Sequence, residues 1–214
     1  DLGDVYVTNG RWNTTKTPPA AWYQNAYQPT PPGGVEECGV VKIAGDGSGV
    51  LWATWLGGSG DDSAAASIRV DSNRYVYVGG STYSDDFPTT PGAADRTYGG
   101  GGAVDFFVAK LSPNGDKLIW ASYVGVGELC RDLDIDADGD IYLPLGWNTR
   151  SGSALPPKWL VKALSNAFQK RPAGGLDCGV VKITSDGSAA KWATWLGGAD
   201  RDTQAASIRV DANG

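Results

Sequence analysis

Four aspartates that alternate along one segment are the residues in this sequence most able to do chemistry. Asp134, Asp136, Asp138 and Asp140 follow the spacing D-x-D-x-D-G-D. Alternating carboxylates on an extended turn can converge on calcium, which prefers about six to eight oxygen ligands. A calcium loop of the EF-hand class would require glutamate where this chain has Leu145. Two hypotheses therefore stay open: a calcium site of another class, or an acidic turn that needs no cofactor.

Tryptophan side chains are the second feature that could bind a ligand, because flat aromatic faces stack on sugar rings. Nine tryptophans are present. Those that recur at one position of the repeat described below, such as Trp52, Trp120 and Trp192, are interpreted as packing residues. The candidates for a ligand lie in longer segments between the repeated motifs, where the alternative role is to anchor those segments. They are Trp12, Trp22, Trp147 and Trp159.

Two other groups of residues carry predictions about bonding. A disulfide between Cys130 and Cys178 is geometrically plausible, because both precede strands that should start at the same end of one repeat. Cys38 matches Cys178 by repeat and is expected to be free or bonded to another chain. Arg69 and Arg209 occupy matching positions and are expected to pair with the acidic segments at 61–62 and 200–202. A funnel that binds an anionic ligand is the alternative for these arginines.

Composition excludes several classes of function. The chain has no histidine, so a Ser-His-Asp triad and a His-ligated zinc site are unavailable. The net charge of −6 argues against binding nucleic acid or an anionic membrane through a basic face. No apolar run approaches the roughly 18 residues of a membrane-spanning helix. We expect no enzymatic activity, with a calcium-assisted hydrolase or lyase as the alternative.

The elements that must position these residues belong to a unit that occurs three times. Residues 38–43 return unchanged as 178–183, with a diluted copy between them. The three copies share one lysine, at Lys42, Lys110 and Lys182. Self-similarity at a fixed period is the signature of a repeat architecture and has to be recognised before the fold is assigned.

Each unit is predicted to form four short antiparallel strands. Strands three and four are joined by Asp-Gly or Asn-Gly dipeptides at 46–47, 114–115 and 186–187, which supply the positive φ angles of a tight hairpin. Four-stranded units repeated in sequence describe a β-propeller. We therefore predict an all-β propeller domain over residues 1–214 with three blades per chain. The repeats cover approximately 1–67, 68–132 and 133–206, and residues 207–214 supply the first strand of a blade that is split between the termini.

Three blades are fewer than the roughly four to eight of a closed propeller ring. Three arrangements stay open. Two chains could form a six-bladed ring in which residues 207–214 of one chain pair with residues 1–9 of the other. The chain could instead be part of a longer propeller, or close alone as a three-bladed ring.

The middle repeat resembles a known family. The resemblance is carried by Leu-Gly-Gly-Ser-Gly-Asp-Asp at 56–62, Tyr-Val-Gly-Gly-Ser-Thr at 77–82 and Asp-Phe-Pro-Thr-Thr-Pro-Gly-Ala at 86–93. These motifs are similar to the bacterial SBBP repeat, named for a seven-bladed β-propeller. The first and third repeats depart from it between strands two and three. The resemblance implies a secreted or surface-attached bacterial protein, and it supplies no catalytic residues.

Together these observations predict a non-catalytic interaction or structural module that acts outside the cytoplasm, where a disulfide persists. A carbohydrate-binding propeller that uses the loop tryptophans is the alternative. The expected partners are a second copy of the chain or further blades, together with a glycan or a surface protein.

Overall fold

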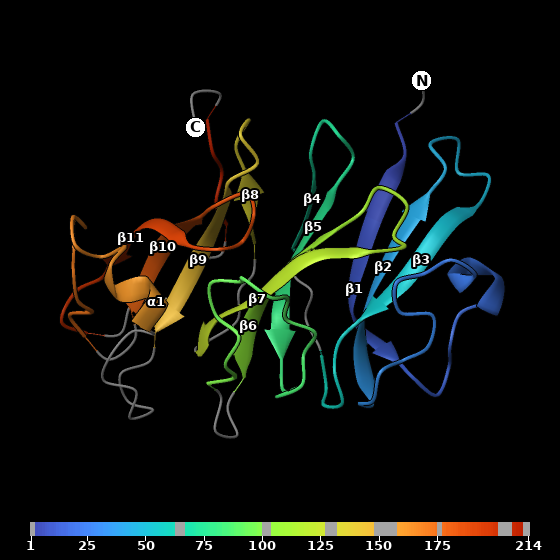
Figure 1. Ribbon diagram of the computed structural model, residues 1–214, viewed down its shortest axis with the longest axis horizontal. Coiled ribbons are helices and arrows are strands. Elements are labelled where there is room, and N and C mark those ends of the chain that lie inside the picture. The colour runs from blue at the N-terminus through green and yellow to red at the C-terminus, as the bar shows by residue number, and fades with distance from the viewer. Residues whose placement is uncertain are drawn as a thin grey trace.

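The computed structural model describes residues 3–62, 67–99, 104–126, 132–147, 158–174, 177–200 and 207–211. Three antiparallel sheets lie side by side, with the second sheet between the other two (Figure 1). The first sheet contains β1 (Val5–Asn13), β2 (Glu36–Ile43) and β3 (Val50–Leu56). The second contains β4 (Ser67–Val70), β5 (Val76–Thr82), β6 (Asp105–Leu111) and β7 (Leu118–Val126). The third contains β8 (Asp134–Ile135), β9 (Ile141–Trp147), β10 (Asp177–Ile183) and β11 (Ala190–Leu196).

The predicted four-stranded antiparallel unit is confirmed in the second and third sheets, where sequential strands pair in order. Hairpins join β2 to β3, β6 to β7 and β10 to β11 at the predicted dipeptides. Their glycines Gly47, Gly115 and Gly187 have φ angles of 73°, 67° and 72°. A residue with a side chain rarely adopts this left-handed backbone conformation, so glycine is the suitable residue there.

The second sheet is packed on both of its faces, and every residue of β5 is buried. On one face Tyr77 shares a hydrophobic cluster with Leu143 of the third sheet. On the other face Phe107 shares a cluster with Val40 of the first sheet. Burial on both faces explains why β5 and β6 read as nearly continuous apolar runs rather than as an alternation.

The long insertions between the second and third strands of each unit cover the outer edge of each sheet. Backbone amides of Trp55, Tyr123 and Trp195 donate to carbonyls of these insertions at 3.1, 3.0 and 3.0 Å. In their described parts the insertions contain two short helices, η1 (Ala20–Tyr23) and α1 (Lys158–Val161). Covering the edge strands in this way prevents them from pairing with other chains. None of the described helices is long and apolar enough to span a membrane.

The two terminal segments lie at different ends of the row of sheets (Figure 1). Residues 207–211 run beside β8, where the amides of Ile208 and Val210 donate to Asp132 and Asp134 at 3.1 and 2.9 Å. Within the described part of the chain these residues do not pair with β1. The described parts of the two terminal segments therefore do not share a sheet inside one chain.

Candidate functional site

The lysine that recurs in every repeat lies on the third strand of its unit and contacts an aromatic ring. The ammonium of Lys42 lies 5.2 Å from the ring centre of Tyr6, and that of Lys182 lies 4.9 Å from Tyr142. Lys110 lies 4.7 Å from the ring of Tyr77. Attraction between a cation and the face of an aromatic ring stabilises this arrangement in all three sheets.

In the first and third sheets the lysine also has a close carboxylate partner. Lys42 pairs with Asp4 at 2.9 Å. Lys182 pairs with Asp136 at 2.8 Å and with Asp140 at 3.2 Å. Burial lowers the pKa of Lys182, but hydrogen bonds to Asp136, Tyr142 and Asp140 outweigh burial and raise that pKa above its usual value.

Lys110 differs because Tyr75 occupies the position that Asp4 and Asp140 hold in the other sheets. Its ion pair is with Asp71, and the N–O distance is 3.9 Å. The carboxylate of Asp71 instead accepts hydrogen bonds from the Tyr77 hydroxyl at 3.1 Å and from the amides of Asn73 and Tyr75 at 2.9 Å each. Burial therefore lowers the pKa of Lys110, and the distant charge of Asp71 only partly offsets this.

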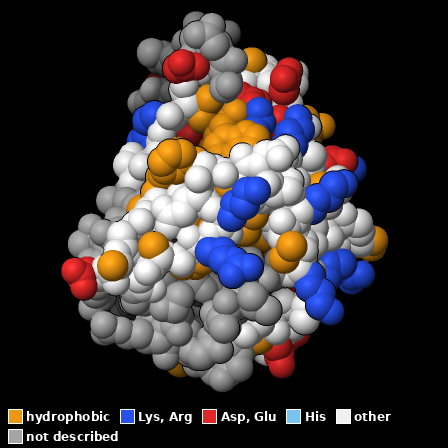
Figure 2. Space-filling model, turned by 90° about the vertical axis from the view of Figure 1, so that its left-hand side faces the viewer, with side chains coloured by type: hydrophobic (Ala, Val, Ile, Leu, Met, Phe, Trp, Pro, Cys, Tyr) orange, Lys and Arg blue, Asp and Glu red, His pale blue; other side chains and the backbone are white. Residues whose placement is uncertain are grey.

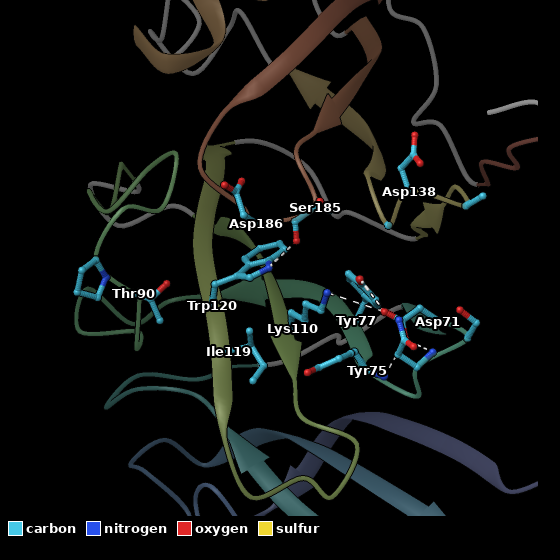
Figure 3. Close-up of a pocket in the computed structure, with 15 residues that line it drawn as sticks. Asp71, Tyr75, Tyr77, Thr90, Lys110, Ile119, Trp120, Asp138, Ser185 and Asp186 are labelled. Atoms are coloured by element: carbon cyan, nitrogen blue, oxygen red, sulfur yellow. Dashed lines mark hydrogen bonds and ion pairs between the residues drawn. The ribbon is translucent and has the colours of Figure 1, made fainter.

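A cleft of about 500 Å³ opens beside Lys110, between the second and third sheets (Figure 3). Lys110, Tyr75, Thr90 and Ser185 line it. Asp138 and Asp186 also line it. A cleft that combines apolar rings with a few convergent polar groups, one of them with a shifted pKa, is the usual form of a small-molecule site.

Two local features hold the wall of this cleft in place. The indole nitrogen of Trp120 donates to the carbonyl of Ser185 in the adjoining sheet at 3.0 Å. The carboxylate of Asp186 accepts hydrogen bonds within its own turn from Thr184 at 2.6 Å and from the Ser188 hydroxyl at 2.7 Å. These bonds lower the pKa of Asp186, so its carboxylate is charged at neutral pH.

A second cleft occupies the corresponding place between the first and second sheets, with a volume of about 620 Å³. It is lined mainly by tryptophan, amide and carboxylate side chains: Trp22, Gln24, Asn25, Trp52, Asn114 and Asp116. Of the four tryptophans predicted to bind a ligand, Trp22 therefore lies at a cleft.

The other predicted tryptophans have different surroundings. Trp12 belongs to β1 and packs edge-on against Trp55, with ring centres 5.3 Å apart. Trp159 packs against the core of the third sheet. The backbone of Trp147 pairs with Asp177, and the side chain of Trp147 lies outside the described part of the structure. For Trp12 and Trp159 the structure supports the anchoring alternative.

The four aspartates of the predicted calcium site do not form a group that could hold a metal ion, a finding that covers the described residues. Asp134 pairs with Arg69 at 3.0 Å, Asp136 with Lys182, and Asp140 with both Lys182 and Lys191. Asp138 is exposed on the turn. The cation that these carboxylates attract is a side chain of the protein, so the acidic turn is the better interpretation.

The two arginines form the predicted ion-pair network, but with partners other than those predicted. Arg69 donates to Asp132 at 3.1 Å and Arg209 donates to the other oxygen of Asp132. Burial raises the pKa of Asp132, but hydrogen bonds from the amide of Ile208, from Arg209 and from Ser207 outweigh burial and lower the pKa to about 2. Asp132 therefore ties residues 207–211 to β4.

The cysteines decide between two alternatives for Cys38 and leave one prediction open. Of the two states predicted for Cys38, the free thiol is the one observed; the side chain is buried, and burial raises its pKa to about 12. Cys130 lies outside the described residues, and the disulfide to Cys178 stays a prediction. The thiol of Cys178 donates to the carbonyl of Leu196 at 3.0 Å.

A set of acidic residues was missed at the sequence level. Glu37, Asp105 and Asp177 each stand five residues before the recurrent lysine, and all three are buried. Burial, reinforced by the nearby Asp62, raises the pKa of Glu37 to about 8. Burial likewise raises the pKa of Asp105 to about 6. Their constant spacing from the lysine was the signal that could have identified them.

Antiparallel sheets stacked side by side, two of them with four strands in the described part of the chain, match the architecture of β-propeller repeats. Residues 51–88 match the family model of the SBBP repeat, described as a beta-propeller repeat. The match runs from β3 through β4 and β5 to Pro88, and so confirms the resemblance for this stretch. No curated protein matches the chain.

Proposed function

We propose that this chain is a non-catalytic binding module that recognises a polyhydroxylated ligand, such as a carbohydrate, in the cleft beside Lys110. The observation that carries the proposal is that Lys110 lines a cleft and, among the described residues, has no carboxylate as close as those of its two counterparts. An ammonium with donor capacity to spare can bond the hydroxyl oxygens of a sugar.

The charges around the cleft favour a neutral ligand over an anion. Asp71, Asp138 and Asp186 line the cleft together with Lys110, so its acidic side chains outnumber the basic one. Carboxylates accept hydrogen bonds from hydroxyl groups, while Ser185 and Thr90 can either donate or accept. The ring of Tyr75 supplies an apolar surface for the carbon face of a sugar.

A glycan array followed by calorimetric titration tests this proposal. The array should contain neutral and acidic glycans, and the titration should use the strongest neutral hit. We expect Lys110→Met to weaken binding at least about tenfold, which corresponds to one lost charged hydrogen bond. Lys162→Met, at an exposed position away from the cleft, serves as the matched control. An array without neutral hits, or equal affinity of Lys110→Met and the wild type, would refute the proposal.

A specific observation favours a second carbohydrate site of the same kind. The cleft between the first and second sheets combines two tryptophans with three amide side chains and one carboxylate. Amide groups offer both donors and acceptors to sugar hydroxyls. In the same titration Trp22→Ala should reduce the number of sites or the affinity without affecting Lys110-dependent binding.

The wider setting of the module is also a proposal. A location outside the cytoplasm, at a cell surface or secreted, suits a chain that resembles secreted repeat proteins and offers clefts for glycans. The disulfide between Cys130 and Cys178 would persist there. Fractionation of the source cells tests the location directly, and recovery in the cytosol would contradict it.

A further inference from the structure

Neighbouring sheets meet through the same contact twice within the chain. Two side chains on the second strand of the later sheet bury against the sheet before it. In the second sheet these are Val76 and Val78, packed against the first sheet. In the third sheet they are Ile141 and Leu143, packed against the second sheet.

The sheet before the contact contributes an indole and an aliphatic side chain from its last strand. The indole nitrogens of Trp52 and Trp120 donate to carbonyls at the hairpins of the following sheets, at 3.1 Å to Pro113 and 3.0 Å to Ser185. Leu56 and Val124, four residues further along, are buried in both contacts.

The indole rings lie directly over the hairpin glycines. A methyl group on Gly115 would lie 2.5 Å from the ring of Trp52, and one on Gly187 would lie 2.4 Å from the ring of Trp120. Glycine therefore has two roles at these hairpins: it permits the positive φ angle and leaves room for the indole.

The third sheet presents the same side chains, and among the described residues no further sheet packs on them. Trp192, the counterpart of Trp52 and Trp120, is 41% exposed, and Leu196, the counterpart of Leu56, is 43% exposed. Phe168 in the adjoining insertion is 90% exposed. This end of the molecule shows hydrophobic side chains among Lys and Arg side chains (Figure 2). Exposed apolar surface of this kind marks an interaction site.

The first sheet presents the complementary surface at the other end of the row. Val5 and Val7, the counterparts of Val76 and Val78, are 49% and 41% exposed. A methyl group on Gly47 would meet no atom within 4 Å, so its hairpin lies open to an indole ring. Among the described residues no side chain donates to the carbonyl of Gly45, which corresponds to that of Pro113.

The strand order adds a third element to the match. The connection from β7 leads to β8, the first strand of the next sheet, and residues 207–211 follow β11 in the same way. The corresponding strand β4 pairs Ile68 with Val78 and Val70 with Val76. Applied to residues 207–211 and β1, this register would place Ile208 opposite Val7.

We propose that two copies of this chain assemble head to tail through these two ends. Residues 207–211 of one copy add as a fourth strand to β1 of the other, and Trp192 seats its indole on the hairpin at 44–49. The contact that joins neighbouring sheets within the chain thereby forms twice more, once at each junction between the two copies. Two identical contacts related by a two-fold axis give a closed assembly of six sheets.

Mass in solution gives the first test. Sedimentation equilibrium of the full chain should show a particle of twice the 22.3 kDa chain mass. A particle of the chain mass at concentrations up to about 0.1 mM would overturn the proposal, as would a species larger than two copies. Because the proposal does not depend on the clefts, failure to bind glycans leaves it unaffected.

Substitution at the proposed contact gives the second test. Trp192→Gln should weaken dimerisation at least about tenfold and leave the circular dichroism spectrum unchanged, because the side chain is exposed in the monomer. Tyr83→Gln, at a residue that is 50% exposed and outside both surfaces, is the matched control and should leave dimerisation unchanged. A dimer that Trp192→Gln does not weaken would overturn the proposal.

Cross-linking tests the register independently of affinity. A chain carrying Ile208→Cys, mixed with a chain carrying Val7→Cys, should form a disulfide-linked heterodimer on mild oxidation. Ile208→Cys mixed with Lys162→Cys should not, since Lys162 lies outside both surfaces. Equal yields from the two mixtures would contradict pairing of residues 207–211 with β1.

Discussion

Replacing Lys182 with methionine removes the cation that faces two nearly buried carboxylates, those of Asp136 and Asp140. Breaking a buried pair from one side typically lowers stability by about 3–5 kcal/mol, because it leaves a charge without compensation. Here the loss should be smaller, since Asp136 keeps the Tyr142 hydroxyl and Asp140 keeps Lys191. We expect Lys182→Met to lower the free energy of unfolding by about 2–3 kcal/mol.

The same substitution at Lys110 is the matched comparison within the chain. Lys110 has only a distant pair with Asp71, whose carboxylate keeps its bonds to Tyr77 and to two backbone amides after the change. Burial lowers the pKa of Lys110, which means that folding disfavours its charged form. Methionine removes that charge, so Lys110→Met should change the free energy of unfolding by less than about 1 kcal/mol in either direction.

Urea denaturation, monitored by circular dichroism, measures the free energy of unfolding of both variants. The comparison requires that this free energy falls with urea concentration at the same slope in each variant. For a chain of this length each kcal/mol corresponds to roughly 2–4 °C in Tm, so Lys182→Met should melt about 5–10 °C below the wild type. The raised pKa of Lys182 means that its stabilising contribution is complete below about pH 10.5 and is lost as the pH rises through its folded value. Equal losses from the two substitutions would refute the argument that Tyr75 has left Lys110 without a close carboxylate partner.

Three further predictions concern other buried groups. Because folding raises the pKa of Glu37 from 4.5 to about 8, the wild type should lose stability between about pH 5 and 8, and Glu37→Gln should reduce that loss by on the order of 2 kcal/mol in urea titrations. Asp132→Asn should lower stability by about 1–3 kcal/mol at pH 7. Thermal melts should show this difference shrinking as the pH falls from about 4 through about 2, where the wild-type carboxylate is protonated. Trp120→Phe should lower stability by about 1–2 kcal/mol through loss of its bond to Ser185, whereas Trp192→Phe should change the Tm of dilute monomer by less than about 2 °C.

The strands and hairpins could be predicted because their signals are local. An Asp-Gly or Asn-Gly pair fixes a hairpin wherever it lies, and all three such pairs stand in register with the repeat. The family match over residues 51–88 draws on the same local motifs. Because the same strand pattern occurs in several repeats, a signal that is weak in one strand becomes reliable when the repeats are compared.

The charges could not be assigned in the same way, because their partners come from other strands and other sheets. Asp134 belongs to a sequence that suits calcium, yet Arg69, 65 residues away, supplies the positive charge. Asp132 was not a candidate, although it joins two arginines from different units. Whether a carboxylate is paired with a cation or protonated depends on its burial. Burial in turn depends on how the sheets stack and not on spacing along the chain.

Alignment of the repeats shows that Tyr75 stands where the other units have Asp4 and Asp140. The effect of this exchange on Lys110, however, depends on how the sheets stack. In an exposed strand, exchanging Asp4 or Asp140 for tyrosine would leave a solvated lysine. At this depth the exchange leaves Lys110 with two aromatic rings, at 4.6 and 4.7 Å, and a carboxylate at 3.9 Å. An apolar side chain would fill the same space without disfavoured charge. The proposed ligand would use this ammonium, and sites that bind ligands are where such local costs are expected.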